Sequence, residues 1–138
     1  MDFQKMTEYR NTHSPYVQRQ GIVVEEIGPG YARVTKTVLP EDANPLGVPH
    51  GGVYFTMADT ACGSAMASHG YMAVTMDANY HFFRSAAIGE CLTAEAKEVK
   101  GGKTICVFDA RVTGQHGVLL GTGTFTVYKL EEKMEYET

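Results

Sequence analysis

The sequence predicts an α+β fold in which an antiparallel sheet of five to six strands wraps around one long central helix. Three observations support this prediction. The chain has 138 residues, which is enough for one domain, 1–138, and too few for two. From Gly51 to about His69, apolar residues recur at three- and four-residue intervals, the period of a helix. On both sides of this segment, glycines separate stretches that are rich in β-branched residues.

The first third of the chain predicts short helices and then a hairpin. Residues 1–13 form an N-terminal helical segment, and Ser14-Pro15 is typical of an N-cap followed by proline at the first helical position. Strands are predicted over 22–27 and 31–39, joined by a Gly-Pro-Gly turn. Residues 40–49 predict a loop.

The long helix has small residues on its core face, including Ala58, Ala61 and Ala65, so whatever packs there comes very close. After it, the residues from Val74 to Phe83 alternate with a period of two, which predicts a half-buried strand. The residues on its predicted apolar face are Val74, Met76, Ala78, Tyr80 and Phe82.

The last third predicts a three-stranded meander. Its strands are 90–100, 103–113 and 118–128, joined by glycine-containing turns. Residues 129–138 predict a frayed tail, because they are polar and lack periodicity.

Charge and composition exclude several classes of partner. Twelve Lys and Arg against sixteen Asp and Glu leave a net charge of −4 with no basic run, so nucleic acid is not expected as a partner. No apolar run is long enough for a membrane span or a signal peptide, so no membrane partner is expected. Three cysteines without a C-x-x-C pair are typical of reduced thiols, which predicts a cytoplasmic protein.

The sequence lacks the motifs of a zinc site, a serine nucleophile elbow and a phosphate-binding loop. The five histidines have neither the i, i+4 spacing nor the cysteine partners of a zinc site, so the sequence implies no metal and no cofactor. There is no G-x-S-x-G elbow, and Cys62 lies on the core face of the helix, where we interpret it as an inert small hydrophobe. Gly102-Lys103-Thr104 resembles the end of a phosphate-binding loop but lies in a hairpin turn.

The passage from Asn44 to Ala61 admits two interpretations. In the structural one, its glycines form a turn, His50 is an N-cap and Asp59 is a solvated helix position. Against this, Asp59 lies about 100° from the centre of the core face, on a stripe shared with Phe55, Cys62 and Met66. Burial disfavours the charged form of a carboxylate at the edge of the core, so its ionisation requires a favourable interaction.

Gly51-Gly52 at the helix start completes a functional interpretation. Free N–H groups and the helix dipole there stabilise an oxygen that gains negative charge. A carboxylate and such a donor are the minimal equipment for acyl transfer to water. Gly51 and Asp59 lie about 12 Å apart along one helix, so both cannot contact one carbonyl. A two-fold axis that sets two helices antiparallel would bring Gly51 of one subunit beside Asp59 of the other.

The motif N-x-x-G-x-x-H-G-G-x-x-F-x-x-A-D-x-A over 44–61, with the segments 75–80 and 83–90, resembles the hotdog-fold acyl-CoA thioesterases, most of all the phenylacetic-acid-degradation (PaaI-like) subfamily. The resemblance covers residues 14–128. It implies a hotdog fold, hydrolysis of acyl-CoA substrates, and homodimers that often pair into homotetramers. The strand that carries Asp77 and Asn79 would form the dimer seam.

The resemblance also implies site residues. Asp59 matches the catalytic carboxylate, as general base or nucleophile, and Gly51 the residue whose N–H polarises the thioester carbonyl. Asn44 matches a polar residue near the reacting water, and His50 one that shapes the pocket. Thr75 falls where some relatives carry a hydroxyl near that water, although alternation predicts it on the face opposite Val74 and Met76. The residues expected to contact substrate are Gly52, Phe55, Thr75, Arg84 and Lys103, the last two as cations for the nucleotide of CoA.

Two other functions stay open at this point. A hotdog module could bind and sense acyl-CoA without catalysis, although no basic recognition helix occurs in residues 1–20. A hotdog dehydratase would need a differently placed His with Asp or Glu. An apolar acyl pocket is expected from Phe55, Met66, Tyr54, Tyr80 and Phe82, but the sequence leaves aromatic, medium-chain and long-chain acyl groups open.

Overall fold

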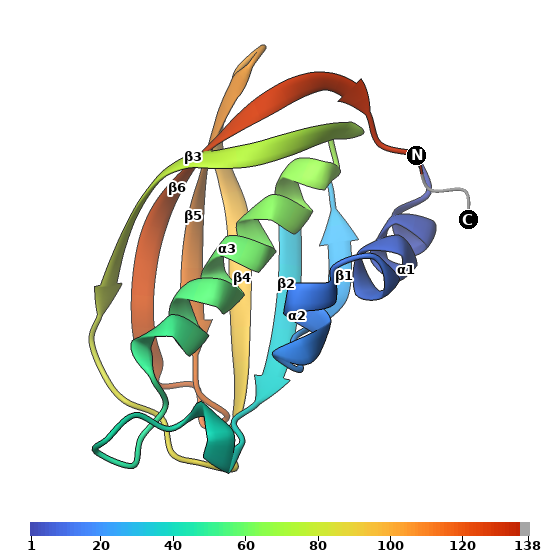
Figure 1. Ribbon diagram of the computed structural model, residues 1–138. Helices are drawn as coiled ribbons and strands as arrows, with labels where there is room; N and C mark the ends of the chain where they lie inside the picture. Colours follow the sequence, from blue (N-terminus) through green and yellow to red (C-terminus); the bar gives the residue numbers. More distant parts are fainter. Residues whose placement is uncertain (136–138) are drawn as a thin grey trace.

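The computed structural model describes residues 1–135 and confirms the predicted α+β class. The helices are α1 (Phe3–Thr12), α2 (Pro15–Arg19) and α3 (Gly51–Ala67), with one 3₁₀ turn, η1 (Pro40–Asp42). The strands are β1 (Val23–Gly28), β2 (Tyr31–Thr37), β3 (Tyr71–Phe82), β4 (Cys91–Gly101), β5 (Ile105–Thr113) and β6 (Leu119–Lys133). They form one antiparallel sheet in the order β1-β2-β4-β5-β6-β3, which curves around α3 (Figure 1).

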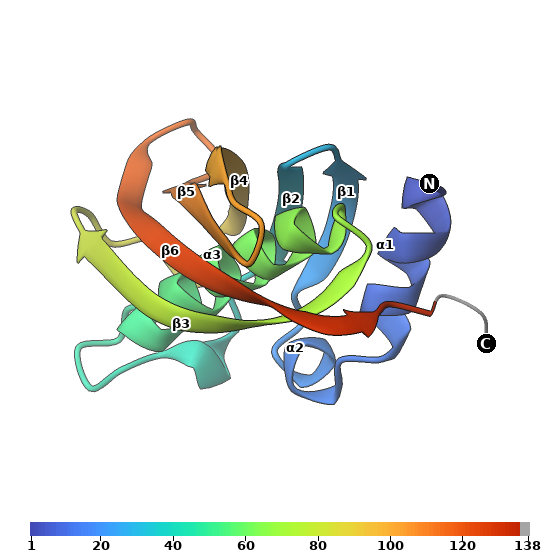
Figure 2. The same cartoon turned by 90° about the horizontal axis from the view of Figure 1, so that it is seen from above.

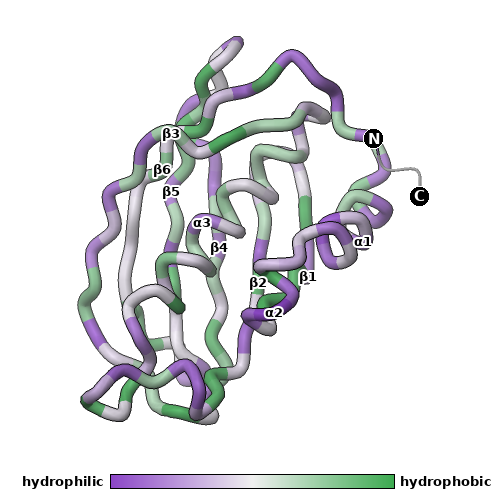
Figure 3. Tube along the Cα trace, viewed as in Figure 1, coloured by the Kyte–Doolittle hydropathy of each residue, from purple (hydrophilic) through white to green (hydrophobic). Residues whose placement is uncertain are grey.

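The core lies between the concave face of the sheet and α3. Ala58, Ala61 and Ala65 are fully buried, as the small-residue face predicts, because only small side chains let the helix approach β2, β4 and β5 this closely. The view from above shows α3 enclosed by the sheet, with α1 and α2 outside it beside β1 (Figure 2). Apolar segments alternate with polar ones along the strands (Figure 3). Within residues 1–135, no helix has both the length and the apolar character to cross a membrane.

Strand β3 is an edge strand with a bulge, and this overturns part of the predicted alternation. Pairing with β6 passes from Thr75 opposite Val127 to Asp77 opposite Thr126, which leaves Met76 without an opposite residue. Because one extra residue shifts the two-residue period, the faces exchange at Met76. Val74 and Met76 were expected on the apolar inner face, but they are 52% and 56% exposed.

The predicted frayed tail over 129–138 is wrong for its first part. Strand β6 continues to Lys133 because it pairs with the start of β3, where Tyr71 lies opposite Lys133. The N–H of Met134 then donates to the carbonyl of Gly70. Periodicity did not reveal this extension because both of its faces are largely exposed. Residues 136–138 of the predicted tail lie outside the described residues.

The predicted loop over 40–49 contains the 3₁₀ turn η1 and is anchored by a buried ion pair. The side chain of Lys36 is 1% exposed, and its Nζ lies 3.0 Å from Oδ2 of Asp42 and donates to the carbonyl of Gln20. The same carboxylate oxygen accepts the N–H of Leu39. These contacts hold the segment that leads to the start of α3.

Candidate active site

The start of α3 presents a free backbone donor. His50 is the N-cap, as the structural interpretation predicted: its Nδ1 accepts the N–H of Gly52 at 2.8 Å, and its own N–H donates to the carbonyl of Asp42. The N–H of Gly51 has no acceptor within the part of the chain that the structure describes. The first turn therefore keeps one N–H group, aligned with the helix dipole, available for a developing oxyanion.

Asn44 and Gly51 share a cavity of about 320 Å³ with Arg84. The side-chain oxygen of Asn44 accepts the N–H of Leu46 at 2.9 Å, so the residue also shapes its own loop. Phe82 lines the same cavity beside the helix, where a Cβ added to Gly51 would lie 3.3 Å from its ring.

Asp59 lies two turns further along α3, half-buried, in a different cavity of about 520 Å³. The hydroxyl of Thr75 donates to its Oδ1 at 2.7 Å. Alternation predicted Thr75 on the face opposite Val74 and Met76, and this is correct. That face is the inner face of the sheet, because the bulge reverses which side chains point inward in the strand beyond it.

Residues from α1 and α2 complete the cavity around Asp59, and no pattern in the sequence assigned them to the site. They are Tyr9, Arg10, His13, Ser14 and Val17. Tyr9 stacks on His13 with ring centroids 4.0 Å apart, and Nε of Arg10 donates to the buried hydroxyl of Ser64 on α3 at 2.8 Å. No local pattern reports a contact between residues about fifty positions apart.

The chain thus separates the predicted catalytic residues into two groups. Asn44, Gly51 and Arg84 line one cavity, while Asp59 and Thr75 line the other. This agrees with the estimate that Gly51 and Asp59 cannot act on one carbonyl within a single chain.

Three of the expected contact residues lie elsewhere. Gly52 is exposed and its N–H is already bonded to His50. Phe55 lines neither cavity, since its ring packs on Phe125 and Tyr80 with centroids 5.4 and 6.4 Å away. Lys103 is in the β4–β5 hairpin, near the start of β3, and Arg84 follows the end of β3. The two expected cations therefore lie at opposite ends of this strand.

Two core residues are unavailable for chemistry or substrate. Met66 was expected in the acyl pocket but is fully buried in the main core. Cys62 is fully buried as well, and burial together with the nearby Asp59 charge raises the pKa of its thiol. The thiol stays protonated at neutral pH, which confirms its interpretation as a core residue.

Comparison with known proteins identifies the family. The model of the Thioesterase superfamily matches residues 46–120. A relative from Archaeoglobus fulgidus is 36% identical over 78% of this chain and 70% of its own. Acyl-coenzyme A thioesterase PaaI of Escherichia coli is 33% identical, covering 78% of this chain and 80% of the relative.

Solved structures support the same family. The E. coli PaaI protein from the phenylacetic acid degradation operon superposes with a TM-score of 0.89 and 26% identity, over 96% of this chain and 98% of that one. A thioesterase protein from Streptococcus pneumoniae, solved with coenzyme A, has a TM-score of 0.78 and 28% identity, over 82% and 88%. The chain belongs to the Thioesterase superfamily, and within it to the PaaI-like hotdog thioesterases. It is a thioester-hydrolysing enzyme.

Proposed function

We propose that this enzyme hydrolyses acyl-CoA thioesters to a free acid and CoA, with Asp59 as general base or nucleophile. The observation that carries the proposal is the 2.7 Å hydrogen bond from Thr75 to Asp59 inside a cavity of about 520 Å³. That bond holds one carboxylate oxygen and leaves the other free to take a proton from water or to attack the thioester carbonyl. The Gly51 N–H would stabilise the oxyanion that forms.

The relatives support this chemistry. PaaI of E. coli is named an acyl-coenzyme A thioesterase, and structures from Streptococcus pneumoniae and Streptococcus mutans carry coenzyme A and acetyl-CoA. The S. pneumoniae protein has also been solved with an aspartate and, separately, a threonine replaced by alanine. Those two residues are 16 positions apart, the separation of Asp59 and Thr75.

The site would be completed by a second copy of the chain through the free edge of β3. This edge is 12 residues long and exposes Val74 and Met76, and such an edge favours pairing with another strand. The Asp59 cavity is lined by residues 71–75 of β3, and the Gly51 cavity by Phe82 and the three residues after it.

Antiparallel pairing of β3 with the same strand of a partner would set the start of one strand beside the end of the other. Each Asp59 cavity would then adjoin the partner's Gly51 cavity, which gives two equal sites about a two-fold axis. Asn44 and His50 would belong to the Gly51 side, Asn44 near the reacting water and His50 as the cap that orients the helix start. Further pairing of dimers into a tetramer is a prediction that sedimentation would test.

Arg84 would bind the phosphates of CoA, because it is the cation that lines the Gly51 cavity. Lys103 lies in the hairpin near the start of β3. It would reach the nucleotide only in the dimer, where the end of the partner's β3 lies beside this hairpin. Both would contribute binding energy that is equal in ground and transition states, so the loss of either should raise KM for a CoA thioester more than for a pantetheine thioester.

Release of free thiol from a panel of acyl-CoAs tests the proposal. We expect turnover by the wild type and a kcat lower by about 10² to 10⁴ in Asp59→Asn, the usual worth of a positioned base. The variant should keep its fold, oligomeric state and affinity for CoA. An acyl-CoA sensor would bind the same ligands without releasing thiol, and a dehydratase would change the acyl chain instead; either result would refute hydrolysis by this site.

A further inference from the structure

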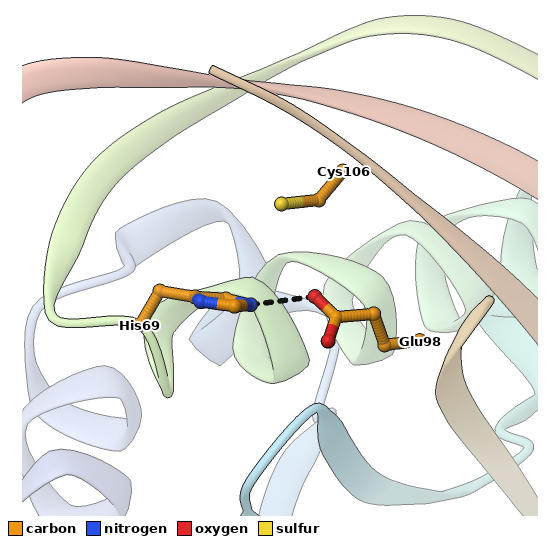
Figure 4. A group of neighbouring side chains, drawn as sticks. All are labelled: His69, Glu98 and Cys106. Atoms are coloured by element: carbon orange, nitrogen blue, oxygen red, sulfur yellow. Dashed lines mark hydrogen bonds and ion pairs between the residues drawn. The ribbon is translucent and has the colours of Figure 1, made fainter. Parts of the chain in front are cut away.

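A second cluster of chemically active side chains lies at the other end of α3. It consists of His69, in the turn after α3, Glu98 on β4 and Cys106 on β5 (Figure 4). It lies about 15 Å from Asp59 by helical rise, so it is separate from the thioesterase site. The histidine spacing gave no sign of it, because the three residues come from three elements that only the fold brings together.

Their donor atoms converge on one point. Nε2 of His69 lies 2.6 Å from Oε1 of Glu98, and these atoms and the Cys106 sulfur all lie within 4.8 Å of one another. In Figure 4 the carboxylate and the imidazole point toward each other, and the sulfur lies beside the line between them. Cys106 is 1% exposed, whereas the side chains of His69 and Glu98 are 31% and 24% exposed, which leaves a path to solvent.

Glu98 is out of place for a purely structural carboxylate. On β4 it continues the core-facing row of Leu92, Ala94 and Ala96, positions that are fully buried. The backbone of Gly101 packs directly against it, since a Cβ on Gly101 would lie 3.2 Å from both carboxylate oxygens, closer than an ordinary contact. An inward carboxylate costs desolvation energy unless it has a counter-charge, and His69 supplies one only when it is protonated.

We propose that His69, Glu98 and Cys106 bind one Zn²⁺ ion, with water in the fourth position. Imidazole nitrogen, carboxylate oxygen and thiolate sulfur are the three ligand types of zinc, and thiolate disfavours Mg²⁺ and Ca²⁺. With bonds of about 2.0–2.3 Å, tetrahedral donors lie roughly 3.3–3.8 Å apart. The His69–Glu98 contact would open by about 1 Å and the sulfur would close by a similar amount, which are side-chain movements.

Charge balances on binding. Cys106 releases its proton to solvent, neutral His69 donates a ring nitrogen lone pair, and the thiolate with the Glu98 carboxylate neutralises the two charges of the ion. The Sγ of Cys106 donates to the carbonyl of Gly102 at 3.7 Å, and binding of Zn²⁺ would replace this bond. Near the cluster, the ammonium of Lys129 lies over the ring of Tyr71, 4.7 Å from its centroid. The ion would tie the end of α3 to β4 and β5, and its fourth position would stay open to water.

The test uses the protein with residues 1–138, stripped with a chelator and then titrated with Zn²⁺ or Co²⁺. We expect one equivalent of Zn²⁺ to bind and to raise the Tm, since an ion that binds only the folded state stabilises it. Co²⁺ should produce the thiolate-to-metal charge-transfer band of a cysteine ligand. Each of Cys106→Ser, His69→Gln and Glu98→Gln should weaken Zn²⁺ binding at least about 100-fold, beyond the roughly 10- to 100-fold loss typical of outer-shell changes.

Cys91→Ser is the matched control, because Cys91 is an exposed cysteine outside the cluster and its loss should change nothing. Failure of the stripped wild type to take up Zn²⁺, or a Co²⁺ complex without the thiolate band, would overturn the proposal without reliance on any variant. Unchanged affinity in folded Cys106→Ser protein would overturn it as well.

Discussion

The hydroxyl of Thr75 donates a 2.7 Å hydrogen bond to Oδ1 of Asp59, from a strand that reverses its faces one residue later, at the Met76 bulge. The bulge lets β3 direct Thr75 toward α3 in its first half and Ala78 and Tyr80 toward the core in its second half, where both are partly buried. Bulges recur beside active sites for this reason, because they redirect single side chains.

Thr75→Val should lower kcat by about 10- to 100-fold, since a hydrogen bond to a charged group is worth roughly 1.5–3 kcal/mol. Valine keeps the shape and the strand preference, so the fold should persist. Thr75→Ser restores the hydroxyl and should recover most of the activity. Steady-state thiol release measures all three proteins, and equal kcat in Thr75→Val and wild type would show that the bond plays no part in turnover.

Mixing Gly51→Pro protein with Asp59→Asn protein should restore activity in mixed dimers. Proline is well tolerated at the first helical position, which Gly51 occupies, and it removes the N–H. The site formed by the intact Gly51 of one chain and the intact Asp59 of the other carries no lesion. Thiol release after subunit exchange measures the recovery.

Gly51→Ala is the matched control for this experiment. It adds the same Cβ beside Phe82 but keeps the N–H, so it should retain far more activity than Gly51→Pro. Complete exchange, verified by differently tagged chains, with no gain in rate would mean that each site is built from one chain.

Met76→Glu should break the dimer. It places a charge on the free edge of β3, and a second copy would bring a like charge close to it across the two-fold axis. Monomeric protein with strongly reduced thiol release is the expected result by sedimentation and assay. Val99→Glu, at an equally exposed apolar position on β4, should leave both unchanged. A fully active monomer would disprove the shared site.

Lys36→Ala should lower the free energy of unfolding by about 3–5 kcal/mol, because it leaves the Asp42 carboxylate without its buried partner. Urea denaturation gives the value. In Lys36→Met/Asp42→Asn no charge is stranded, so this double variant should recover much of the loss. If both variants lose the same stability, the effect comes from packing and not from the ion pair.

The sequence alone determined the frame of this protein. Helical period marked α3 to within two residues of its end, its alanines identified the buried face, and glycines marked the hairpins. The motif around His50 and Asp59 identified the family that the comparisons confirm. These features are local: each depends on spacing within a few residues, and spacing is what a sequence displays directly.

Only the tertiary structure decided the details of the site. The Met76 bulge depends on how β6 pairs with β3, and the cover over Asp59 depends on where α1 packs. Burial of Lys36, in a row that otherwise holds apolar side chains, depends on Asp42 lying opposite. In each case the free energy comes from contacts between segments far apart in the chain, and such contacts leave no periodic trace in the order of the residues.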